Sequence, residues 1–108
     1  MQFWDTSELE IEPHHPKVLR SDDELRAIVI QLPEGEQLQE HQVHERAYVV
    51  VLDGAVAIER GEETVRGTAG TLVHFEPNER RTLTATRDAR LLLILAPWPG
   101  VGHPSRHE

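Results

Sequence analysis

The stretch Ala47-Tyr48-Val49-Val50-Val51-Leu52-Asp53-Gly54-Ala55-Val56-Ala57-Ile58-Glu59-Arg60 decides the fold class. Its first six residues are rich in β-branched side chains, and residues 55–60 show the period-two alternation of a half-buried strand. Asp53-Gly54 between them is a strong signal of a tight hairpin turn, since these residues tolerate the backbone conformation of such turns. The stretch therefore predicts two antiparallel strands, 47–52 and 55–60, joined by a hairpin.

Further strand signals lie on both sides of this hairpin. They cover residues 25–32, 64–66, 71–75, 81–85 and 89–95, and turns are predicted between them at 61–63, 67–70, 77–78 and Arg87-Asp88. Only Ser21-Asp22-Asp23-Glu24 resembles the start of a helix, and it is too short to form one. Short strands spaced about ten residues apart, without a long helical period, predict an all-β antiparallel sandwich or barrel.

Composition limits the cellular setting and the partners. The 108 residues suit a single domain, with a core from about residue 19 to 95 and extended segments at both ends. The formal net charge of −8 argues against nucleic acid and anionic membrane surfaces as partners. The sequence has no cysteine, no signal-peptide pattern at its start and no apolar run long enough to span a bilayer. We therefore expect a cytoplasmic protein.

Two segments resemble the motifs of the cupin family. Gly35-Glu36-Gln37-Leu38-Gln39-Glu40-His41, followed by Val51-Leu52-Asp53-Gly54, resembles the first motif, and residues 70–81 resemble the second. The resemblance covers about residues 19–95 and implies the cupin barrel, a double-stranded β-helix or jelly roll. It implies no single activity, because cupins carry out very many functions.

The resemblance also implies a position for a metal site. In cupins, two histidines and a glutamate of the first motif and a histidine of the second bind a divalent metal inside the barrel. His41 fits the first of these positions, whereas Val43, Ala47 and Arg81 occupy the other three. One hypothesis is therefore a metal-dependent cupin enzyme of the dioxygenase, isomerase or lyase type, with an altered ligand set.

That altered set would consist of His41, His44 and His74. A bulge could turn His44 inward, with Glu40 or Glu45 as a further ligand. His74 shares one strand face with Leu72, and it could supply a third nitrogen only if that face is the inner one. Imidazole and carboxylate ligands suit Zn, Fe, Mn or Ni.

The preferred hypothesis is a binding protein without a metal. A guanidinium at a ligand position repels cations and offers a fork of donors that suits a carboxylate. Arg81, with Tyr48 and His41, is therefore predicted to bind a small anionic or aromatic molecule in the barrel. Alternatively, Arg81 forms a salt bridge with Glu40 or Glu45, or Arg80-Arg81 is only a solvated turn.

Two apolar features suggest how the domain is completed. Trp98 lies between two prolines, and it is expected to fold back as a plug on the barrel or to pack at a subunit interface. The run Leu91–Leu95 is apolar on both faces, as in a strand that is covered on both sides. These features favour a homodimer, and a structural role through such pairing is a third hypothesis.

Overall fold

The computed structural model describes residues 1–38 and 44–99, and every strand pairing in it is antiparallel. Its strands are β1 (Lys17–Ser21), β2 (Arg26–Leu32), β3 (Gln37–Leu38), β4 (Arg46–Arg60), β5 (Glu63–Thr68), β6 (Leu72–Phe75) and β7 (Thr82–Ala96). Neither described range contains a helix, so neither has one that could cross a membrane. The predicted all-β antiparallel fold is confirmed.

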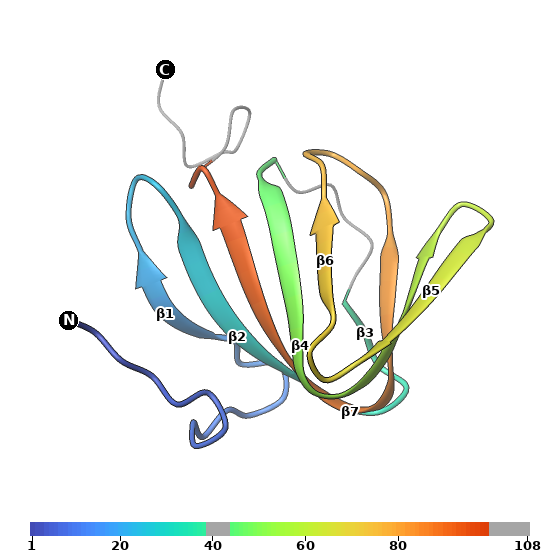
Figure 1. The fold of residues 1–108 in the computed structure, drawn as a ribbon, viewed down its shortest axis with the longest axis horizontal. Coiled ribbons are helices and arrows are strands. Elements are labelled where there is room, and N and C mark those ends of the chain that lie inside the picture. The colour runs from blue at the N-terminus through green and yellow to red at the C-terminus, as the bar shows by residue number, and fades with distance from the viewer. Residues whose placement is uncertain (39–43, 100–108) are drawn as a thin grey trace.

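Two long strands, β4 and β7, form the frame of the barrel (Figure 1). They pair with each other, and each takes part in both of the sheets that face one another. Residues 46–51 of β4 lie between β7 and β6, and β2 and then β1 extend this sheet beyond β7. Residues 55–60 of β4 lie between β7 and β5, and β3 adds to the far side of β7. Each long strand therefore bends from one sheet into the other.

The hairpin turn predicted at Asp53-Gly54 is wrong, and so is the turn predicted at Arg87-Asp88. Both pairs lie inside continuous strands, at the bends of β4 and β7. Gly54 has a φ of +84°, and a Cβ added there would lie 2.0 Å from the carbonyl oxygen of Asp88. The glycine is thus required for a left-handed backbone and for the close approach of two strands, not for a hairpin.

Irregular pairing at this bend decides which side chains enter the barrel. The β4–β7 register shifts between Val51 and Val56. Val49 and Val51 are buried before the shift, and Val56 and Ile58 are buried after it, so the inward positions change from odd to even numbers. A β-bulge has this effect because one added residue reverses the alternation of side chains. Both halves of β4 can therefore contribute to the same core.

The inner face of the barrel carries one apolar core. The buried members come from β2, β4, β6 and β7 and are Leu32, Ala47, Val49, Val51, Val56, Ile58, Phe75, Leu83, Ala85, Ala89, Leu91 and Leu95. Trp98 packs against this core, as the plug interpretation predicted. The opposite face of β7 carries Leu92 and Ile94, which are only half-buried.

Two short strands that precede β4, β1 and β3, were not predicted from the sequence. The helix-like signal at residues 21–24 marks the turn between β1 and β2. In this turn Asp22 Oδ1 accepts hydrogen bonds from the backbone N–H groups of Glu24 (2.8 Å) and Leu25 (3.1 Å). Such a side chain replaces helical hydrogen bonds with a local turn, which is why acidic and polar residues favour both structures.

Candidate functional site

Arg81 lies inside the barrel, immediately before β7. Its exposed fraction is 9%, and it alternates in phase with the buried Leu83 and Ala85. The guanidinium carbon lies 4.7 Å from the centre of the Phe75 ring, a distance at which a cation is attracted to an aromatic face. Burial lowers the pKa of Arg81, and the charge of Glu79 partly opposes that shift.

The loop between β6 and β7 holds Arg81 in this position. Asn78 has a φ of +63°, which confirms that asparagine can take the left-handed turn position that a glycine holds in the cupin motif. Glu79 fixes the loop at two points, since Oε2 lies 3.3 Å from Arg60 Nη1 and Oε1 accepts a hydrogen bond of 3.1 Å from the N–H of Glu76. The loop is therefore tied both to itself and to the end of β4.

The sequence left two alternatives for Arg81: a solvated turn formed by Arg80-Arg81, and a salt bridge with Glu40 or Glu45. Arg80 is exposed while Arg81 is buried, so the pair is not simply a solvated turn. Among the described residues, the ion pairs do not include one between Arg81 and Glu45, although each of these residues has an interaction partner. Glu45 is also buried, with an exposed fraction of 1%, and Glu40 lies outside the described residues.

In the described part of the chain, a small cavity lies directly beside Arg81. A cavity of about 10 Å³ is lined by Leu38, Val49, Phe75, Arg81 and Leu83. This volume is close to the smallest that can hold one water molecule. Within the described part of the chain, a group that contacts the inner side of this guanidinium must therefore be very small.

Tyr48 and His74 do not lie in the same space as Arg81. They are cross-strand neighbours on β4 and β6, and their ring centres are 4.8 Å apart. Ala47 and Phe75, the neighbours of each along its strand, are buried in the core, so Tyr48 and His74 project from the outer face. The structure thus separates these two predicted site residues from Arg81.

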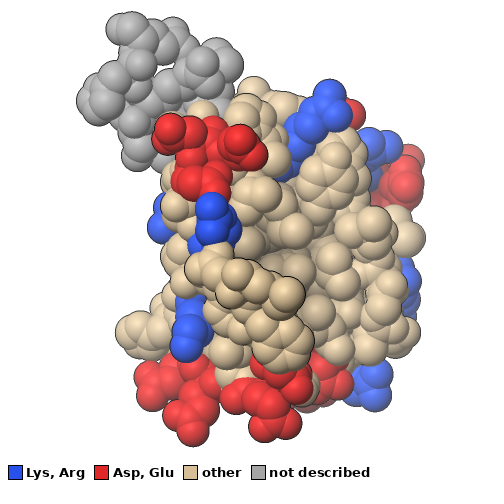
Figure 2. All heavy atoms as spheres, turned by 60° about the vertical axis from the view of Figure 1, so that its left-hand side comes forward, with Lys and Arg blue, Asp and Glu red and all other residues tan. Residues whose placement is uncertain are grey.

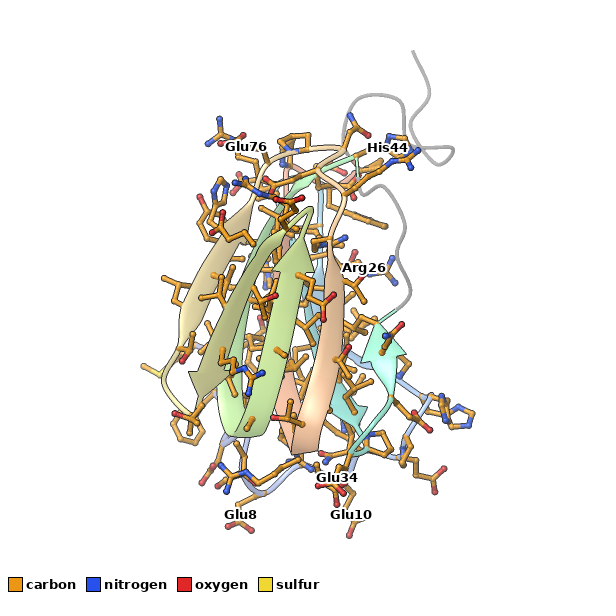
Figure 3. The ribbon with its side chains drawn as sticks, turned by 90° about the vertical axis from the view of Figure 1, so that its right-hand side faces the viewer. Glu8, Glu10, Arg26, Glu34, His44 and Glu76 are labelled. Carbon is orange, nitrogen blue, oxygen red and sulfur yellow. The ribbon has the colours of Figure 1, made fainter. Side chains whose placement is uncertain are left out.

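Two other predicted metal ligands are His44 and His41. His44 lies at one end of the barrel, and His41 lies outside the described residues. His44 is half-buried just before β4, and Figure 3 shows it at the end of the barrel that also carries Glu76. Residues 1–38 and 44–99 contain no cluster of three histidine or acidic side chains arranged to hold a metal. His41 and Val43 are outside those ranges, so a metal site that includes His41 stays a prediction.

Arg26 is a second cation of the inner face, and the sequence interpretation missed it. It alternates in phase with Ile28, which packs against the core, and its neighbour on β7 is Leu95. Its guanidinium carbon lies 4.6 Å from the ring centre of Trp98. Its Nε is buried and has no hydrogen-bond partner among the described residues. The available signal was a charged side chain within the largely apolar predicted strand 25–32.

Two wider hollows lie elsewhere on the surface. One of about 600 Å³ lies beside β2 and β3 and is lined by His14, Pro16, Ile30, Gln31, Leu32, Glu36, Gln37 and Leu38. The other, of about 490 Å³, is lined by Thr6, Ser7, Gln31, Leu52, Asp53 and Arg90. In the second hollow Arg90 donates to the carbonyl of Thr6 (2.6 Å) and to Gln31 (3.0 Å), so its donors hold the N-terminal segment against the sheet.

Comparisons with known proteins agree with this architecture. The profile of the family described as Cupin domain matches residues 28–96. Similar solved structures include a Klebsiella pneumoniae protein with a double-stranded β-helix domain (14% identity, 93% of this chain and 94% of that one, TM-score 0.78). KdgF from a Halomonas species is also similar (18%, 89% and 94%, 0.75), as is a Streptococcus pyogenes protein of unknown function (23%, 88% and 86%, 0.73). Curated protein sequences gave no match.

Proposed function

The chain belongs to the cupin family, and from this premise we propose that it binds a small carboxylate at the end of the barrel where Arg81 lies. The observation that carries the proposal is Arg81 itself, a guanidinium that is 9% exposed, stacked on Phe75 and turned into the barrel. Burial strengthens the attraction between a cation and an anion, because less water screens them. The planar fork of donors matches the two oxygens of a carboxylate.

Part of the acidic charge lies far from Arg81, although Glu79 in the adjoining loop is close enough to act on its guanidinium. Figure 3 shows Glu8, Glu10 and Glu34 at the opposite end of the barrel from His44 and Glu76. In Figure 2, which brings the β1 and β2 side forward, acidic side chains gather along the lower edge and in a second group at the upper left, and the middle of that face is uncharged. At physiological ionic strength, charges much farther away than about 8 Å are largely screened.

The small cavity beside Arg81 suggests how such a ligand would be placed. About 10 Å³ leaves room for little more than an atom or two at that point. The acidic group would therefore contact the guanidinium, and the rest of the molecule would extend toward the mouth of the barrel. This arrangement favours a carboxylate at the end of a slender or flat molecule.

The test is a binding series with Arg81→Gln. Acetate, butyrate and benzoate are titrated calorimetrically into the wild-type protein and the variant, with Arg80→Gln as a control that removes the same charge from the exposed neighbour. Loss of a charge-assisted hydrogen bond, worth about 1.5–3 kcal/mol, should weaken binding by roughly 10- to 100-fold in Arg81→Gln only. Equal affinities in both variants, or no binding to the wild type, would refute the proposal.

The alternative function is a metal-dependent cupin enzyme in which His41 and His44 are ligands. Its test is the metal content per chain after purification without a histidine tag or chelator, and after soaking with Zn, Mn, Fe and Ni. Metal near one ion per chain that is lost in His44→Ala would favour the enzyme. Wild-type protein that stays empty after soaking would count against it.

A further inference from the structure

We propose that the hollow lined by Arg90 and Asp53 binds a small α-amino acid as a zwitterion, with its carboxylate on Arg90 and its ammonium on Asp53. The hollow has a volume of about 490 Å³, which lies within the range of about 300–1,000 Å³ that is usual for small-molecule sites. It lies on the outer face of the sheet, whereas Arg81 lies inside the barrel. The inference is therefore independent of the proposed function.

A β-bulge brings an acid and a base into this hollow. Val51 pairs with Leu91 and Asp53 pairs with Arg90, so Leu52 is an extra residue on β4. Bulges re-aim the side chains around them, and here both Leu52 and Asp53 line the hollow together with Arg90. On β7, Arg90 is the neighbour of the buried Leu91, so its side chain projects from the outer face.

The two charged groups share the hollow without pairing. Arg90 and Asp53 are cross-strand neighbours, but the ion pairs of the described residues do not include one between them. The guanidinium is turned the other way, because its Nε donates to Gln31 on β2 (3.0 Å) and its Nη1 donates to the Thr6 carbonyl (2.6 Å). Since β2 and β4 flank β7 on opposite sides, a gap remains between the guanidinium and the carboxylate.

Arg90 keeps donors available for a ligand. A guanidinium has five N–H groups, and the hydrogen bonds of Arg90 within residues 1–38 and 44–99 use only its Nε and Nη1. In the same ranges, Arg26 Nε is the one buried side-chain nitrogen or oxygen without a partner. Nη2 of Arg90 is therefore not buried, and it can donate to a carboxylate that enters the hollow. Asp53 is exposed and can accept from an ammonium.

The gap has the length of an α-amino acid with a hydrogen bond at each end. Gln31 and Asp53 stand on either side of Arg90, two strand spacings or about 10 Å apart, which sets the scale of the gap. The ammonium nitrogen and the carboxylate oxygens of an α-amino acid are about 3 Å apart. With a charge-assisted hydrogen bond of about 2.8 Å at each end, the molecule spans roughly 8–9 Å.

The paired charges also select against other ligands. Asp53 repels a simple anion and Arg90 repels a simple cation, so a molecule that carries both charges is favoured over one that carries either alone. A zwitterion has no net charge, and the net charge of −8 therefore does not oppose its approach. Leu52 supplies an apolar wall, which favours an amino acid with an apolar side chain.

The experiment compares L-leucine with 4-methylpentanoate, the same molecule without its ammonium. Both are titrated calorimetrically into the wild type, Asp53→Asn and Asp23→Asn, in which Asp23 is an exposed acid of the turn between β1 and β2. In Asp53→Asn, affinity for L-leucine should fall about five- to tenfold, and affinity for 4-methylpentanoate should not fall, because Asp53 attracts only the ammonium. Asp23→Asn should leave both affinities within about twofold of the wild type.

Two further readouts separate this site from folding and from the site inside the barrel. The Asp53 side chain is exposed and takes part in no ion pair of the described residues, so unliganded Asp53→Asn should melt at the wild-type temperature. Arg81→Gln should bind L-leucine as the wild type does. A wild type that does not bind L-leucine, an Asp53→Asn variant that binds it with wild-type affinity, or loss of L-leucine binding in Arg81→Gln would each overturn the inference.

Discussion

Gly54 provides the most quantitative test of the fold, because its side-chain position is already occupied. In Gly54→Ala the new Cβ would lie 2.0 Å from the carbonyl oxygen of Asp88 and 2.7 Å from the Cα of Ala89. Both are backbone atoms of β7, so no change of rotamer can relieve the overlap. The two long strands would have to separate at the bend.

The expected loss of stability has two parts. A φ of +84° costs an alanine about 1–2 kcal/mol. Separation of the strands should weaken two or three ladder hydrogen bonds, each worth about 1 kcal/mol. The sum, about 3–5 kcal/mol, is a large share of the roughly 5–15 kcal/mol that stabilises a domain of this size.

The matched control is Gly35→Ala. Gly35 has nearly the same φ, +86°, but an added Cβ there would have nothing within 4 Å. Its expected cost is only the backbone part, about 1–2 kcal/mol. Urea unfolding followed by tryptophan fluorescence and circular dichroism measures both variants. Equal free energies of unfolding for Gly54→Ala and Gly35→Ala would show that the close approach of β7 contributes nothing, and would refute the reasoning.

Three further predictions concern other parts of the molecule. Arg90→Gln should release the N-terminal segment, because it removes the 2.6 Å hydrogen bond to the Thr6 carbonyl, and limited proteolysis should then cut before residue 16 faster than in the wild type. Gly67→Ala places a Cβ 2.7 Å from Thr71 Cγ2 and 2.9 Å from Thr71 Oγ1, so denaturation should show a loss of about 1–3 kcal/mol, most of which Thr71→Ala, which removes both atoms, should restore. The pKa of Asp22 is lowered by hydrogen bonds from the Glu24 N–H, Arg20 and the Leu25 N–H, so its stabilisation is complete above its unfolded pKa of about 4 and is lost as the pH falls through the lower folded value. Wild type and Asp22→Ala should accordingly differ in melting temperature at pH 7 and converge in acid; a constant difference would contradict the assignment.

Most strands could be predicted from local pattern, but their connections could not. Residues 55–60 and 89–95 have clear strand composition, and both lie in strands of the structure. Asp53-Gly54 was misassigned because a hairpin and a bulged bend need the same property, a residue that accepts positive φ. What separates the two cases is the partner, Asp88, which lies far along the chain. No local window contains that information.

Only part of the candidate site could be predicted from the sequence, again because long-range strand pairing is not visible in a local stretch. The motif register alone pointed to Arg81, and the structure places it inside the barrel. The faces of Tyr48 and His74 could not be assigned from the sequence, because a shift of one residue reverses every side chain of a strand. Arg26 was overlooked because it matches no motif position.

Two of the three substituted motif positions, Ala47 and Arg81, make physical sense together in the proposed site. A glutamate at position 47 would lie between Leu95 and Phe75, and Phe75 carries the ring on which Arg81 stacks. Its carboxylate would compete with any anion for the guanidinium of Arg81, since a fixed intramolecular acid has a higher effective concentration than a dissolved one. Alanine at this position removes that competitor. An arginine in place of a metal-binding histidine favours anion binding only when the neighbouring metal-binding carboxylate is absent as well, and in this chain both changes occur.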